Sequence, residues 1–130
     1  MESELGQKTP LVEIWDNIIL VPVIGILDTH RAEKLSEELL QKIVEEEAKF
    51  VIIDIAGVEA MDTRVVKHLI DIIKALKLMG SNAVISGMRP DVAKTLVGLD
   101  VVFQVPTFNV LRRALHYTFN QMNLKVVNIE

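Results

Sequence analysis

Two threonines in matching positions carry the clearest chemical signal in this sequence. Thr29 and Thr63 each follow an aspartate, Asp28 or Asp62, and each pair stands between an apolar, β-branched run and an amphipathic helical run. A hydroxyl at a strand-to-helix junction lies where free backbone N–H groups and the positive end of the helix dipole converge. Such a position accommodates a phosphate. The two threonines therefore suggest a switch rather than a catalyst, and we expect Asp28 and Asp62 to cap the helices that follow.

The repetition of this setting favours a regulatory function over a purely structural one. An Asp-Thr pair before a helix is also an ordinary cap. Phosphorylation would add about −1.5 to −2 charges at each threonine. The helix end would favour that charge by ~0.3–1 kcal/mol, while the neighbouring aspartate would oppose it. The expected effect is a change of surface potential and partner fit, with the fold retained.

No other residue pattern indicates catalysis or a cofactor. The chain has no cysteine, which excludes disulfides, thiolate metal sites and cysteine nucleophiles. Its three histidines stand apart without a second ligand at metal spacing, and no glycine-rich phosphate loop is present. Asp54 ends a strand-like run as a phospho-accepting aspartate would, but the acidic pair and the lysine of a receiver domain are missing. We predict a non-enzyme with no cofactor and no metal.

Composition limits the class of protein. At 130 residues, half of them apolar, the chain is expected to form one domain with a substantial core. A net charge of −4 and a pI near 5.4 argue against nucleic acid as a partner. The start of the chain is polar and acidic, unlike a signal peptide, and no apolar run is long enough to span a membrane. We expect a cytoplasmic domain over residues 11–121, with 1–10 a linker or disordered and 122–130 a tail.

Hydrophobic periodicity predicts alternating strands and helices. The predicted strands are Leu11–Trp15, Ile18–Ile24, Phe50–Ile55, Ala83–Ser86 and Val101–Val105. The predicted helices run from Asp28 or Thr29 to about Ala48, from Asp62 to about Met79, from Pro90 to just before Gly98, and from a cap at Thr107 through Phe119. Asp16-Asn17 predicts a hairpin turn, Pro22 an edge position or a bulge, and Gly57 a turn after the third strand. The order ββαβαβαβα predicts an α/β sandwich with a mixed sheet that opens with an antiparallel hairpin.

At these junctions the sequence resembles the STAS domain family, the fold of sulphate transporters and anti-sigma-factor antagonists. Within that family it is similar to the C-terminal domain of stressosome scaffold proteins of the RsbR type. The resemblance is carried by Val21–Ala32, Ile52–Val58, Met61–Thr63, Leu78–Gly80 and Gly87–Pro90. These segments span nearly the whole chain, and the paired Asp-Thr motifs are specific to the RsbR-type branch.

The resemblance implies a function and a set of partners. A serine/threonine switch kinase would phosphorylate Thr29 and Thr63. The domain would associate with further copies of itself and with a companion STAS scaffold in a large cytoplasmic particle that sequesters the kinase until stress releases it. The ten or so residues before the first strand leave open an excised output domain or a member without a sensor.

Several alternatives remain open at this point. Anti-sigma-factor antagonists place Asp-Ser and then small residues at the second junction, whereas Thr63 precedes Arg64 and Val65; direct pairing with an anti-sigma kinase is therefore an alternative function. A regulatory module of an anion transporter is another, as are an enzyme that uses Asp54 or Asp62 and a nucleotide-binding domain.

Overall fold

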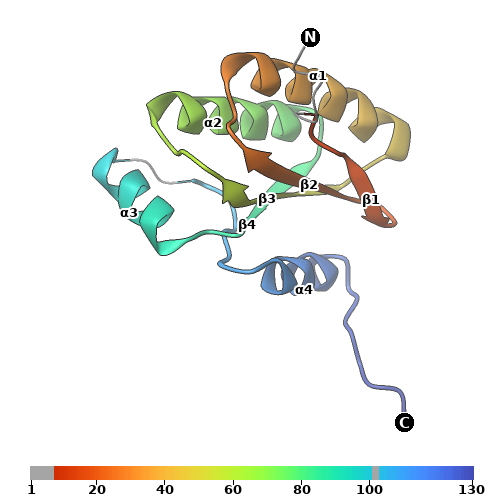
Figure 1. Ribbon diagram of the computed structural model, residues 1–130. Helices are drawn as coiled ribbons and strands as arrows, with labels where there is room; N and C mark the ends of the chain where they lie inside the picture. The colour runs from red at the N-terminus through yellow and green to blue at the C-terminus, as the bar shows by residue number, and fades with distance from the viewer. Residues whose placement is uncertain (1–7, 101–102) are drawn as a thin grey trace.

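The computed structural model describes residues 8–100 and 103–130, which form a four-stranded sheet with helices on both faces (Figure 1). The elements in chain order are β1 (Val12–Trp15), β2 (Ile18–Gly25), α1 (Thr29–Glu46), β3 (Phe50–Val58), α2 (Thr63–Leu78), β4 (Asn82–Ser86), α3 (Pro90–Gly98) and α4 (Leu111–Gln121). The spatial order of the strands is β1-β2-β3-β4; β1 is antiparallel to β2, and the remaining pairs are parallel. The predicted mixed α/β fold class is confirmed.

The sheet opens with the predicted hairpin. Asn17 has a φ of 69° in the turn between β1 and β2, a left-handed conformation that asparagine tolerates better than most residues. Pro22 lies on an inner strand, and the register between β2 and β3 shifts between Pro22 and Ile24. Of the two positions that the proline predicted, an edge or a bulge, the bulge is the one observed.

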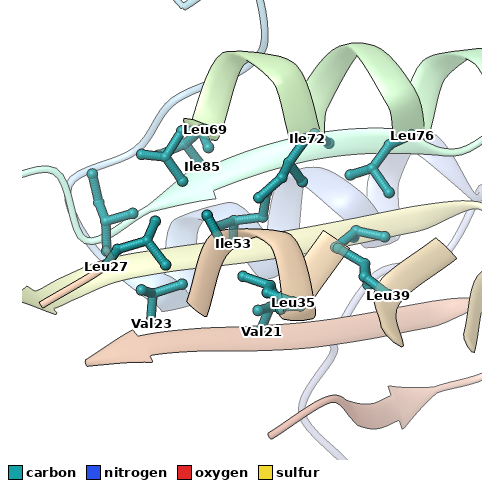
Figure 2. Packing of buried hydrophobic residues seen from close by; sticks show 14 of the residues in the cluster. Val21, Val23, Leu27, Leu35, Leu39, Ile53, Leu69, Ile72, Leu76 and Ile85 are labelled. Carbon is teal, nitrogen blue, oxygen red and sulfur yellow. The ribbon is translucent and has the colours of Figure 1, made fainter. Parts of the chain in front are cut away.

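Two layers of helices cover the sheet (Figure 1). The apolar stripes of α1 and α2 pack on one face, where side chains from β2, β3 and β4 meet them (Figure 2). The largest fully buried side chains of this core include Leu27, Leu39, Ile53, Leu69, Leu76 and Ile85. Burying each such side chain contributes about 1.5–3 kcal/mol. On the other face, Ala114 and Phe119 of α4 pack against Ile18, Ile52 and Val84. The packing of α1 and α2 holds these two helices, which begin at Thr29 and Thr63, against the sheet.

The end of the sheet differs from the prediction. No strand forms over residues 103–105, and the predicted Val101 and its neighbour at position 102 lie outside the described residues. A single parallel bridge instead joins Thr107 to Ile85 of β4. Thr107 therefore does not cap a helix; its hydroxyl donates to the Val105 carbonyl at 3.0 Å, and α4 begins only at Leu111 without a side-chain cap.

The turn predicted at Gly57 is also wrong. The third strand continues to Val58, and Gly57 pairs with Ile24 of β2. A Cβ atom at Gly57 would meet Ile24 Cγ1 at 3.1 Å, so the absence of a side chain permits a close approach of two strands at the bulge. Gly57 is therefore needed because two strands lie close together there, and not because the chain turns.

Among the described residues, no helix combines the length and the apolar character needed to cross a bilayer.

Candidate functional site

The first junction connects β2 to α1 through a short loop. Asp28 has extended backbone angles and caps the helix: its Oδ1 accepts a hydrogen bond from the Arg31 backbone N–H at 2.8 Å. Thr29 is the first residue of α1, and its side chain is exposed. The hydroxyl is thus accessible from solvent at the positive end of the helix dipole, where a phosphate would be favoured.

The Arg31 guanidinium fixes the conformation of this loop. Its Nη1 donates to the backbone carbonyls of Ile24 at 2.8 Å and Ile26 at 2.7 Å. Its Nη2 donates to the hydroxyl of Thr9, which is buried, at 2.8 Å. One side chain therefore joins the first turn of α1, the end of β2 and the segment before β1. Sequence patterns alone did not reveal this role, because it depends on three acceptors in two segments of the chain, around the end of β2 and before β1.

The second junction connects β3 to α2 and repeats the cap. Asp62 Oδ1 accepts a hydrogen bond from the Val65 backbone N–H at 3.0 Å. That bond, followed by the charge of Arg64, lowers the pKa of the Asp62 carboxyl below its ordinary value. Thr63 is the first residue of α2 and is exposed. Its setting is locally the same as that of Thr29.

A different arginine fixes the second junction. Arg89, from the connection between β4 and α3, donates through Nη1 to the Ala56 carbonyl at 2.6 Å and through Nε to Asp91 Oδ1 at 3.1 Å. The same connection includes Gly87, whose φ is +77° and where a Cβ atom would lie 2.2 Å from Asp54 Oδ1. Asp54 itself accepts from the Ala56 N–H at 3.1 Å. Asp54 thus holds local backbone in place and is crowded by a neighbouring loop.

The two junctions lie at the same edge of the sheet, because β2 and β3 are parallel neighbours. One side-chain contact connects the first junction to the helix of the second: Thr29 Oγ1 and His68 Nε2 are 3.2 Å apart. His68 is half-buried in the second turn of α2. Sequence analysis treated His68 as an isolated histidine. Helical spacing could place it one turn into α2, but gave no sign of which α1 residue it would meet.

An exposed apolar patch adjoins the first junction. Ile24 is 65% exposed and Ile26 is 57% exposed, whereas Leu27, which directly follows Ile26, is buried in the core. Large exposed aliphatic side chains beside a polar, chargeable group are typical of a protein-binding surface. We call Ile24, Ile26, Asp28, Thr29 and Thr63 the junction face.

Comparison with known proteins places this architecture in a family. The family profile of the STAS domain matches residues 9–114. The RsbT co-antagonist protein RsbRA of Bacillus subtilis is 35% identical over 123 residues, which cover 94% of this chain and 45% of the relative. A serine-to-glutamate variant of RsbS from Moorella thermoacetica has the same fold, with a TM-score of 0.76, 28% identity, and coverage of 89% of this chain and 98% of that one. A stressosome structure, described as a signal integration and transduction hub, gives a TM-score of 0.74 at 27% identity, covering 88% of this chain and all of that one. The chain spans less than half the length of the RsbRA relative that it matches.

Proposed function

The chain belongs to the STAS domain family, and we propose that it is a phosphorylation-controlled scaffold of a general stress response. In this proposal a serine/threonine switch kinase modifies Thr29 and Thr63, and the domain retains or releases that kinase according to its phosphorylation state. It assembles in the cytoplasm with further copies of itself and with a companion STAS scaffold. The observation that carries the proposal is the shared geometry of the two threonines: both are exposed first residues of capped helices at one edge of the sheet.

The relatives support the pathway to which the proposal assigns the domain. RsbRA is named as an RsbT co-antagonist, and a similar structure is a stressosome component. Exposure supports the assignment of the sites, because a kinase must reach each hydroxyl. Asp54 gives no support to the enzymatic alternative. Its Oδ1 accepts a hydrogen bond from the Ala56 N–H, and Gly87 approaches it so closely that a side chain there would overlap this oxygen.

The mechanism follows from charge on the junction face. Each phosphate would add about −1.5 to −2 charges to the junction face, and a phosphate on Thr29 would do so three residues from Ile26, one of the two exposed aliphatic residues of that face. Placing that charge in a partly apolar interface changes the affinity of a partner that fits the neutral form. A coupling of about 1–3 kcal/mol, or about 5- to 150-fold in affinity, is enough for a switch.

The direct test is phosphorylation by the switch kinase that accompanies the chain in its own genome, with ATP, read by peptide mass spectrometry. We expect phosphate on Thr29 and Thr63 of the unmodified sequence, on the remaining site in Thr29→Val and Thr63→Val, and on neither site in the double variant. Phosphate found elsewhere, with both junction threonines unmodified, contradicts the proposal.

A binding experiment tests the switch itself. Thr63→Glu should leave the circular dichroism spectrum unchanged and alter kinase affinity at least about 5-fold in titration calorimetry. Asn120→Glu is the matched control, because it adds the same charge at an exposed position on α4, across the sheet from α1 and α2. Equal affinities for both variants would contradict a role for the junction face, and unfolding of Thr63→Glu would leave only the capping role.

A further inference from the structure

His68 holds the one contact, among the described side chains, that joins the Thr29 hydroxyl to another helix. Its Nε2 lies 3.2 Å from Thr29 Oγ1, and the tautomer of the ring determines which atom donates. The contact spans α1 and α2, which lie side by side on one face of the sheet (Figure 1). Thr63 is five residues before His68 on α2, and its hydroxyl has no comparable partner within the described chain.

The chemistry of the contact changes if Thr29 is phosphorylated. In phosphoryl transfer from ATP the Thr29 oxygen forms a bond to the terminal phosphorus and gives up its proton to a base of the kinase or to water. The bond between that phosphorus and the bridging oxygen breaks, and ADP leaves with the electron pair. The modified oxygen stays next to the imidazole, and three phosphate oxygens enter the same space. A protonated imidazole can donate an N–H to a phosphate oxygen, a charge-assisted hydrogen bond stronger than the neutral one that it replaces.

The surrounding charges leave His68 well placed for this pairing. On α1, Asp28 already accepts the Arg31 N–H. Glu33, four residues after Thr29, lies on the same face of the helix, whereas His30 directly follows Thr29 and lies on a different face. On α2, Arg64 precedes His68 by one turn, while Lys67 and Asp71 are paired with each other at 3.0 Å. Among the described residues, no Lys or Arg side chain makes a hydrogen bond to Thr29 Oγ1, so His68 is its one side-chain partner.

We propose that His68 is a positioning residue that binds a phosphate on Thr29 and thereby connects the modified first junction to α2, the helix that begins at Thr63. This inference rests on the proposed function only for the source of the phosphate. With an unmodified threonine, the histidine and the hydroxyl share one hydrogen bond. With phosphothreonine, an ion pair holds the N-terminal ends of α1 and α2 together.

The contact can first be tested without any kinase. In protein labelled with ¹⁵N, Thr29→Val should shift the ring ¹⁵N resonances of His68, identified by their loss in His68→Gln. Thr29→Ser should retain them near the original positions. Thr63→Val is the matched control and should leave them unchanged. Identical His68 ring shifts in the parent protein and Thr29→Val would overturn the contact and the proposal with it.

The phosphate-binding step is tested with phosphothreonine installed at position 29 during translation. A neighbouring imidazolium stabilises the phosphate dianion, so the ³¹P titration midpoint should lie about 0.3–1 pH units lower than in His68→Gln. His116→Gln, an exposed change on α4, should leave the midpoint unchanged. Phosphothreonine at position 63 should be less sensitive to His68→Gln than phosphothreonine at position 29.

The outcomes separate this inference from the proposed function. An unchanged ³¹P midpoint in folded His68→Gln overturns the inference, even if the kinase modifies Thr29. A midpoint that depends on His68 supports it, even if the kinase leaves Thr29 unmodified, a result that would contradict the proposed function alone. Should His68→Gln not fold, His68→Asn is measured in the same way, and amide dispersion in the NMR spectrum verifies the fold of either variant.

Discussion

The two strand-to-helix junctions have the same local structure but are held by different parts of the molecule. Each begins with an aspartate that caps a helix and continues with an exposed threonine. The first junction is fixed from within, by Arg31 of its own helix, and connects to α2 through His68. The second is fixed from outside, by Arg89 and the close approach of Gly87. The Asp-Thr motif therefore places each hydroxyl at the start of a helix. Residues distant in sequence, such as His68 and Arg89, determine which other elements a phosphate at that hydroxyl could influence.

The largest expected effect concerns the external support of the second junction. Gly87→Ala places a Cβ atom 2.2 Å from Asp54 Oδ1 and 2.5 Å from the Ala56 nitrogen, at a φ of +77°. Strain in this backbone region costs about 1–2 kcal/mol, and the overlap with backbone adds to it, so we expect about 3 kcal/mol of lost stability. Chemical denaturation with a common m-value gives the free energy of unfolding.

Gly80→Ala is the matched control for that measurement. Its φ is +83°, but a Cβ atom there has no neighbour within 4 Å. The control therefore pays only the conformational cost of about 1–2 kcal/mol. Equal losses for the two variants would show that contact with β3 does not constrain the second junction.

Substituting Arg31 and substituting Arg89 should lower stability by different amounts and should loosen different parts of the molecule. Arg31→Gln removes hydrogen bonds to Ile24, Ile26 and Thr9, and we expect it to lower the free energy of unfolding by about 2–3 kcal/mol. Arg89→Gln removes a short hydrogen bond to the Ala56 carbonyl, a long one to the Ile55 carbonyl and the bond to the exposed Asp91. It should cost about 1–2 kcal/mol, because only the first of these is both short and away from an exposed partner. Amide hydrogen exchange should rise near the first junction in Arg31→Gln and near the second in Arg89→Gln. The same exchange pattern in both variants would contradict separate supports.

Sequence reasoning succeeded where structure is decided by neighbours along the chain. The hairpin at Asp16-Asn17 and the starts of α1 and α2 follow from turn and cap preferences within a few residues. It failed where pairing between distant segments determines the structure. The turn predicted at Gly57 is an example, because pairing with Ile24 keeps Gly57 in β3. The segment predicted as a fifth strand, Val101–Val105, forms no strand over its described residues 103–105, because β-branched content alone does not determine which residues pair. The bridge to Ile85 of β4 comes from Thr107, beyond that segment.

The residues of the candidate site can be separated in the same way, into those identified by local sequence and those identified only by distant contacts. Thr29 and Thr63 could be selected from sequence, because an aspartate and a helical run identify each junction locally. The roles of Arg31, Arg89 and His68 could not, since each depends on an atom between 5 and 39 residues away and on the side of a helix that packing selects. Phosphorylation at the two threonines stays a prediction until a kinase assay is done.

Both aspartate caps should contribute to stability, and the contribution of Asp62 should depend on pH. Asp28→Ala should cost about 1 kcal/mol at neutral pH, and Asp62→Ala should lower the melting temperature as well. The pKa of Asp62 is lowered in the folded protein from an ordinary value of 3.8, mainly by the Val65 N–H. Its contribution to stability is therefore complete above about pH 4 and is lost as the pH falls through the lower, folded value.

Melting temperatures measured from pH 7 to pH 2.5 test this linkage. The difference between the parent protein and Asp62→Ala should be constant down to about pH 4 and should shrink below it. Asp62→Asn is a useful companion, because asparagine also caps helices but does not titrate in this range. A difference that stays constant down to pH 2.5 would show that the carboxylate charge plays no part in the second cap.

The smallest expected effect separates the two hydroxyls themselves. Thr29→Val removes the hydroxyl that lies 3.2 Å from His68 and should lower the free energy of unfolding by about 0.5–1 kcal/mol. Thr63→Val removes an exposed hydroxyl without such a partner in the described chain and should stay within about 0.5 kcal/mol of the parent. Both substitutions preserve the β-branched shape, so helix propensity cancels between them. If the two variants are equally stable, the His68 contact contributes nothing to the unmodified fold, and any difference between the junctions must then arise only after a phosphate is present.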